Sequence, residues 1–88
     1  MTGDQVKFRL MVEQYPTLAR YWDFEKREVK VKTSADLPVS SGEKILMSFF
    51  LSVWFGRNVD FDITRAAGVL STENKLIIAE WFLDPFWP

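Results

Sequence analysis

The run SSGEK at positions 40–44 contains residue types whose spacing could support chemistry. A Ser-x-Gly-Glu run ahead of an apolar helix suggests contact with nucleotide, and Ser41 with Lys44 has the S-x-x-K spacing of a nucleophile and its lysine base. Asp60 and Asp62 are a second candidate, because side chains two residues apart on an extended segment face the same side. There they could hold a divalent cation or share acid-base work.

Nucleotide binding and S-x-x-K chemistry are both disfavoured by what the rest of the sequence lacks. A phosphate-binding loop is rich in glycine, but the glycines here are dispersed and G-x-x-x-x-G-K-[ST] does not occur. Enzymes of the S-x-x-K class are much larger and carry further motifs that are missing here. Ser40 followed three residues later by Glu43 is instead the pattern of a capping box. We therefore predict that SSGEK begins a helix.

The composition removes further classes of active site. The chain has no Cys and no His, so thiolate catalysis, disulfides, the usual general base and the commonest zinc ligand are all missing. For the two aspartates we favour a structural interpretation, in which Asp62 caps the short helix ITRAAGV and Asp60 is a solvated loop residue. We accordingly predict a protein that is not an enzyme and needs no metal, nucleotide or other cofactor.

Length and charge limit the kinds of partner. A chain of 88 residues with 48% hydrophobic residues predicts one folded domain covering positions 1–88. Its 11 basic and 12 acidic residues give a net charge of −1, so no overall field attracts it to nucleic acid or an anionic membrane. The longest apolar stretch, residues 45–55, is far too short to cross a bilayer. Because the first residues also lack a signal-peptide pattern, we expect a cytoplasmic protein without a membrane segment.

The hydrophobic periodicity predicts a mainly α-helical fold, a compact bundle of about four helices. Thr2 with Gln5 opens the first helix, and Pro16 should end it. The helix after Ser40 is apolar nearly all round and should be central, with Gly56 as its C-cap. The last helix should stop at or before Asp84, ahead of Pro85. The expected core comprises Leu10, Met11, Leu46, Phe49, Phe50, Val53, Leu76, Ile77 and Trp81.

Two segments of the chain share a sequence pattern. Residues 28–51 align with residues 60–83, each with an apolar-x-apolar pair, a short link and a Ser-capped long helix. Two interpretations stay open: an internal duplication into two helix-loop-helix halves, or the common pattern of two capped helices. We expect a minimal two-stranded ribbon between VKV (29–31) and FDI (61–63). This outline resembles the EF-hand, but neither loop supplies the acidic ligands that calcium needs.

Residues 20–32 form a charged segment, here called the arm, that interleaves basic and aromatic side chains. Lysine and arginine beside aromatic rings can bind single-stranded nucleic acid through phosphate contacts and stacking. Acidic residues are interspersed, however, so a solvated charged arm is the favoured interpretation. The basic members are Lys26, Arg27, Lys30 and Lys32, the aromatic members Tyr21, Trp22 and Phe24, and the acidic members Asp23, Glu25 and Glu28.

The tail WFLDPFWP places large apolar side chains where termini are usually polar. Either it folds back over its own core, or it anchors a partner or a second copy, since aromatic residues dominate binding hot spots. With the Ser-capped helix and this Pro-Phe-Trp ending, the chain resembles small uncharacterised proteins encoded on bacterial mobile elements, phages or plasmids.

We therefore predict a non-enzymatic protein that acts by protein-protein interaction, such as a phage- or plasmid-encoded inhibitor or adaptor. A homodimer is one form that this interaction could take. The alternative is a nucleic-acid-binding accessory protein that uses the arm. The candidate partner-binding residues are Trp22, Arg27, Glu28, Lys30, Lys32, Phe86 and Trp87.

Overall fold

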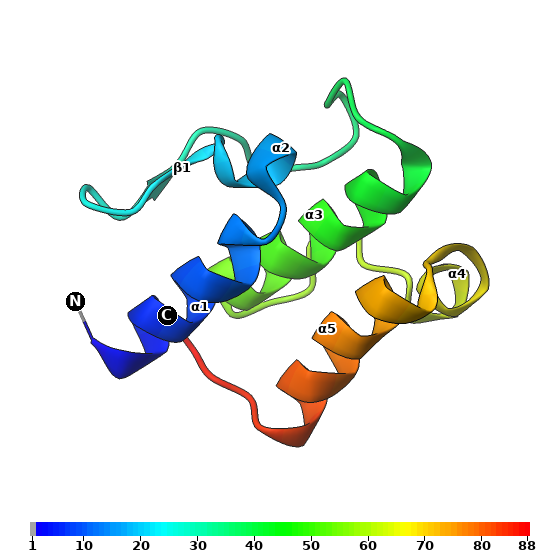
Figure 1. Ribbon diagram of the computed structural model, residues 1–88. Helices are drawn as coiled ribbons and strands as arrows, with labels where there is room; N and C mark the ends of the chain where they lie inside the picture. The colour runs from blue at the N-terminus through cyan, green and yellow to red at the C-terminus, as the bar shows by residue number, and fades with distance from the viewer. Residues whose placement is uncertain (1) are drawn as a thin grey trace.

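Five helices and one two-stranded antiparallel sheet make up the part of the chain that the computed structural model describes, residues 2–88 (Figure 1). The mainly helical architecture is confirmed. There is one helix more than expected, because Pro16 begins a separate short helix after the first one ends. The elements are α1 (Gly3–Glu13), α2 (Pro16–Ala19), β1 (Trp22–Asp23), β2 (Glu28–Val29), α3 (Ser41–Phe55), α4 (Ile63–Val69) and α5 (Thr72–Leu83).

Side-chain caps define where the longer helices begin. At α3, Ser40 Oγ accepts the N–H of Glu43 at 3.2 Å while Glu43 Oε1 accepts the N–H of Ser40 at 3.3 Å. This reciprocal pair confirms the capping box and explains the SSGEK run as a helix start. Thr2 with Gln5 forms the same box at α1, Asp62 caps α4 and Ser71 caps α5. At the other end of α3, Gly56 adopts φ 67°, the left-handed conformation that glycine accommodates best.

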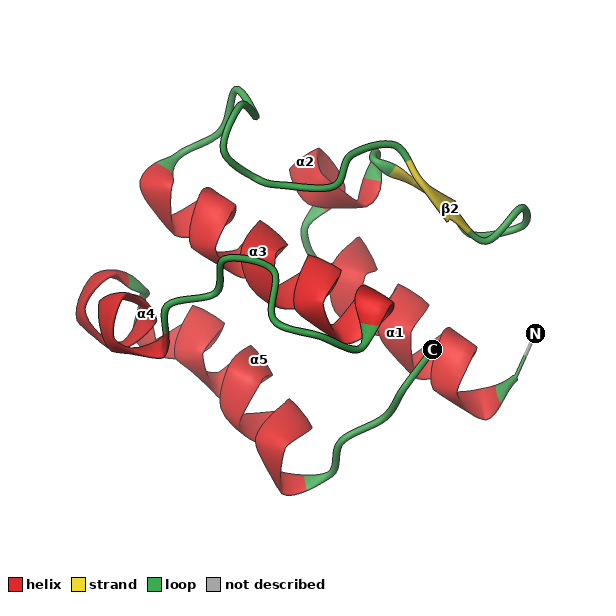
Figure 2. Ribbon diagram, turned by 180° about the vertical axis from the view of Figure 1, so that it is seen from behind, coloured by secondary structure: helices red, strands yellow, loops and turns green. Residues whose placement is uncertain are grey.

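Helix α3 is the centre of the fold. In both ribbon views it runs through the middle, with α2 on one side and α4 and α5 on the other (Figures 1 and 2). Every residue from position 45 to position 51 is buried, as its all-round apolar pattern predicts. Phe8 and Val12 of α1 and Leu18 of α2 pack into the same cluster and are completely covered.

Four residues of the outer helices α1 and α5 are less buried than the sequence predicts. Met11, Leu46, Phe49, Phe50 and Val53 are buried as predicted. Leu10 and Leu76, in contrast, are 62% and 53% exposed, while Ile77 and Trp81 are only partly buried against the core. The prediction was wrong for these two leucines because α1 and α5 are apolar over a wider arc than α3 can cover. Of the 12 residues in α5, only Ile78 is buried.

The sheet also differs from the predicted ribbon. It is a local hairpin in which Trp22 pairs with Val29 and Asp23 with Glu28. Asp23 Oδ1 accepts the N–H of Lys26 inside the turn. The predicted partner segment at residues 61–63 forms no strand, since Asp62 caps α4 and Ile63 is already helical. A hairpin closes a short loop at little entropic cost, whereas the predicted pairing would have closed one of about thirty residues.

The irregular segment between β2 and α3 is held by a buried polar contact. The hydroxyl oxygens of Ser34 and Ser48 lie 2.7 Å apart, and both residues are buried. This contact attaches the segment to the middle of α3. Among the described residues, none of the helices is both long and apolar enough to cross a membrane.

Candidate functional site

The residues first considered for chemistry lie near one another, and one of them caps a helix. Ser41, Lys44, Asp60 and Asp62 line a cavity of about 230 Å³ beside the N-terminus of α3. Asp62 Oδ1 accepts the backbone N–H of Arg65 at 3.1 Å, so it acts as a helix cap. Over residues 2–88 no cluster of three acidic side chains forms that could hold a metal ion.

The aromatic residues of the arm point into the protein. Trp22 is 6% exposed, and its ring lies edge-on to Phe8 at 5.5 Å between centroids. Phe24 packs on the same Phe8 ring, and the Arg9 guanidinium lies over the Phe24 ring, 5.2 Å from its centroid. Trp22 therefore belongs to the core and presents no ring to a partner. The faces of the Trp22 and Phe24 rings are therefore used for packing within the protein, and Tyr21 is partly buried against the core.

The charged residues of the arm remain at the surface. Arg27, Glu28, Lys30 and Lys32 are exposed, although Val29 and Val31 between them are partly buried. Arg27 has φ 55° at the hairpin turn, and its Nη2 donates a 2.7 Å hydrogen bond to the main-chain oxygen of Pro88. The structure thus joins the arm and the tail, two segments that the sequence predicted separately.

The tail, residues 84–88, returns from α5 to the start of α1 (Figure 2). Phe86 packs partly buried against the core, and its carbonyl oxygen accepts a 3.0 Å hydrogen bond from Trp81 Nε1. The backbone N–H of Trp87 donates to Asp4 Oδ2 at 3.2 Å, and the Trp87 ring stands edge-on to Trp81 with centroids 5.0 Å apart. The Trp87 side chain nevertheless remains 58% exposed. Of the two tail residues predicted to bind a partner, Phe86 faces inward and Trp87 outward.

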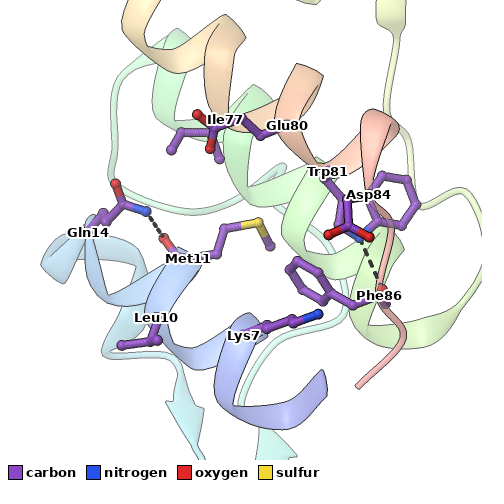
Figure 3. Close-up of a pocket in the computed structure, with 9 residues that line it drawn as sticks. All are labelled: Lys7, Leu10, Met11, Gln14, Ile77, Glu80, Trp81, Asp84 and Phe86. Carbon is purple, nitrogen blue, oxygen red and sulfur yellow. Dashed lines mark hydrogen bonds between the residues drawn. The ribbon is translucent and has the colours of Figure 1, made fainter. Parts of the chain in front are cut away.

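A groove runs between α1 and α5, which lie antiparallel. Two cavities of about 310 and 430 Å³ follow one another along it and share Gln14, Ile77 and Glu80. Figure 3 shows the first of these, with Met11 and Phe86 between the two helices and Leu10 on the α1 side. We call it the α1–α5 groove. Its α1 wall comprises Lys7, Leu10, Met11, Gln14 and Tyr15, and its α5 wall comprises Glu73, Asn74, Leu76, Ile77, Glu80, Trp81 and Asp84.

Hydrogen bonds join the two sides near each end of the groove. At one end, Tyr15 Oη donates to Asn74 Oδ1 at 2.7 Å. At the other, the tail contact between Trp87 and Asp4 brings Phe86 across the opening. Between these ties Leu10 lines the first cavity and Leu76 the second, and both side chains present apolar surface to solvent.

The α5 edge of the groove is negatively charged. Glu73, Glu80 and Asp84 are exposed along it, whereas Lys7 is the single basic residue that lines either cavity. The one ion pair within residues 2–88 joins Arg9 to Glu13, so these carboxylates are not neutralised internally. The pKa of Tyr15 is raised, first by its burial and then by the negative charge of Glu73.

The opposite side of α5 carries a second apolar surface. Cavities of about 370 and 180 Å³ share Phe61, Ile63 and Phe82, and the last two side chains are 58% and 50% exposed. Arg57 lies at one rim of the larger cavity. Helix α5 is therefore bordered by apolar hollows on both sides.

Sequence reasoning missed the α1–α5 groove because Leu10 and Leu76 were assigned to the core. One signal was available. The last helix, TENKLIIAEWFL, carries apolar residues around most of its circumference, which is more than one neighbouring helix can bury. Comparison of the chain with protein-family models, curated proteins and solved structures found no match.

Proposed function

We propose that the protein acts by binding another protein in the α1–α5 groove. The observation that carries this proposal is the exposure of Leu10 and Leu76, 62% and 53%, on the two walls of one continuous groove. Covering apolar surface of this kind releases about 25 cal/mol per Å². A single exposed leucine needs no explanation, but here Leu10 lines one of two adjoining cavities and Leu76 lines the other, which resembles the clustered apolar surface of interaction sites.

The shape of the groove favours a helical partner segment. Two antiparallel helices with a hollow between them can receive a third helix, whose apolar side chains at positions i, i+3 or i+4, and i+7 fill the hollow. Ile77 and Met11 would lie at the floor of this contact, and Leu10 and Leu76 along its sides. Such recognition needs no catalytic residue, which agrees with the predicted role of an inhibitor or adaptor.

The predicted contact residues of the arm and tail would form the periphery of this interface. Arg27 lies beside Pro88, and the tail closes one end of the groove, so a partner that extends past Phe86 reaches both segments. Exposed charges at a rim influence orientation and association rate more than affinity. Trp22 is left out of the proposed interface because it is buried.

The test is a comparison of proteins captured by matched variants from extracts of the cells that make this protein. Leu10→Gln with Leu76→Gln removes the apolar walls without changing charge. Val69→Gln is the control, since Val69 is 48% exposed at the end of α4 and lines none of the cavities described above. We expect the wild type and the control to retain a protein that the double variant does not.

Two results would argue against this function. If no captured protein depends on Leu10 and Leu76, the groove is not the binding site. If capture disappears after nuclease treatment and weakens steeply with salt, the predicted alternative of nucleic-acid binding through the arm replaces it.

A further inference from the structure

We infer that the segment bound in the α1–α5 groove is a basic amphipathic helix, with lysine or arginine beside its apolar stripe. This inference rests on the proposed function and adds the charge of the partner to it. The groove joins an apolar floor to a negatively charged edge, and a basic amphipathic helix complements both features.

The negative edge is a regular row along α5. Glu73 and Glu80 lie at positions i and i+7, which places them on one face of α5, and Asp84 is the C-cap residue that follows the helix. The cavities show that this face borders the groove, because Glu73 lines the second cavity, Asp84 the first and Glu80 both. Three carboxylates therefore follow the full length of the apolar floor.

These carboxylates are free to pair with a partner. All three are exposed, and the one ion pair in the described part of the chain is between Arg9 and Glu13 on α1. The raised pKa of Tyr15, caused first by burial and second by Glu73, is consistent with a negative potential at that end. On the α1 side of the groove the single ammonium of Lys7 balances only one of the three charges.

The same row of charges disfavours a second copy of the chain as the occupant. A twofold axis through the middle of the groove, near Ile77 and Glu80, would place Glu80 close to its own counterpart and Glu73 close to the other copy's Asp84. Like charges brought together at an interface cost free energy. A basic helix instead meets the carboxylates with opposite charge.

The length of the groove defines the length of the ligand. Helix α1 has 11 residues and α5 has 12, so each is about 17 Å long at 1.5 Å per residue. The matching ligand is a helix of about three turns, with apolar side chains on one face and basic ones toward the α5 edge.

A display selection tests the charge of the ligand directly. The library consists of helical peptides with a fixed leucine stripe and flanking positions randomised among lysine, glutamate and glutamine. It is selected on the folded wild-type protein, and binders are then measured on Leu10→Gln with Leu76→Gln and on the Val69→Gln control. We expect lysine to be enriched, and binding to be lost on the double variant but retained on the control.

A charge-reversed protein provides the second measurement. Changing Glu73, Glu80 and Asp84 to lysine alters only exposed positions, and its melting temperature and helical circular dichroism show whether it folds like the wild type. The selected lysine peptides should bind this variant at least tenfold more weakly, and their binding to the wild type should weaken as salt screens the charges. Selection on the reversed variant should enrich glutamate.

The outcomes separate this inference from the proposed function. Peptides that require Leu10 and Leu76 but show no preference for lysine would overturn the basic helix and leave groove binding intact. A selection that yields no groove-dependent helix would overturn the inference as well. The proposed function itself fails on different results, namely captured cellular proteins that are indifferent to the same two leucines or capture that nuclease treatment abolishes.

Discussion

The phenol of Tyr15 donates a 2.7 Å hydrogen bond to Asn74, which lies 59 residues farther along the chain. It connects the N-cap residue of α2 to the first turn of α5. The Tyr15 ring also contacts Phe50 of α3, with ring centroids 5.8 Å apart. One side chain thus holds three helices together at the end of the α1–α5 groove.

The protonation of Tyr15 should make stability depend on alkaline pH. Its pKa is raised in the folded protein, first by burial and then by Glu73. The contribution of the protonated Tyr15 phenol to the free energy of unfolding is therefore fully present below the pKa of about 10 that tyrosine has in the unfolded chain. It is lost as the pH rises through the pKa of Tyr15 in the folded protein. We expect the alkaline loss of stability to be smaller in Tyr15→Phe than in the wild type, measured by urea denaturation across this range.

Glu73→Gln provides the matched control for this titration. Removing the negative neighbour should lower the pKa of Tyr15, but only in part, because burial is the larger cause. The difference in phenolate absorbance between each protein and its Tyr15→Phe counterpart reports the titration. A phenolate that forms at the ordinary tyrosine pKa in the wild type would contradict the prediction.

Two leucine substitutions should differ strongly in their effect on stability. Leu46 in α3 is completely buried, so Leu46→Ala leaves a cavity and should cost about 2 to 5 kcal/mol. Leu76 in α5 is 53% exposed, so Leu76→Ala should cost less than about 1 kcal/mol. Chemical denaturation of both variants measures the difference. Equal costs would mean that α5 packs more tightly than the structure shows.

The buried hydroxyl pair should behave as a coupled unit. Ser48→Ala leaves the Ser34 hydroxyl buried without its partner, which should cost about 1 to 3 kcal/mol. Replacing both serines by alanine removes the unsatisfied group, so the double variant should lose less stability than the two single variants added together. Strict additivity in this cycle would show that the two hydroxyls do not interact.

The two aromatic residues of the tail should contribute unequally. Phe86 is partly buried against the core, whereas Trp87 is 58% exposed. We expect Phe86→Ala to lower the melting temperature more than Trp87→Ala, because it uncovers more apolar surface. Thermal unfolding compares them. If deletion of residues 86–88 leaves the melting temperature unchanged but weakens partner binding tenfold, about 1.4 kcal/mol, the tail is an anchor instead of a cover.

The amino-acid sequence by itself determined the helix starts and the identity of the central helix. Thr2 with Gln5 and Ser40 with Glu43 form hydrogen bonds between residues three apart, so the capping partners are neighbours in the sequence. Gly56 ends α3 because glycine readily adopts the left-handed conformation found at this C-cap. The buried centre of α3 follows from apolar residues on nearly every side, so the helix must be covered by neighbours on most of its faces.

Only the tertiary structure decided which faces of the outer helices are covered. Apolar residues surround most of α5, so periodicity could not show that Ile78 is buried while Leu76 borders a groove. The pairing of β1 with β2 and the contact of Arg27 with Pro88 were likewise beyond the sequence pattern. Helix caps depend on residues only three positions apart in the sequence. Burial, strand pairing and grooves depend instead on how segments that are distant in the sequence pack against one another.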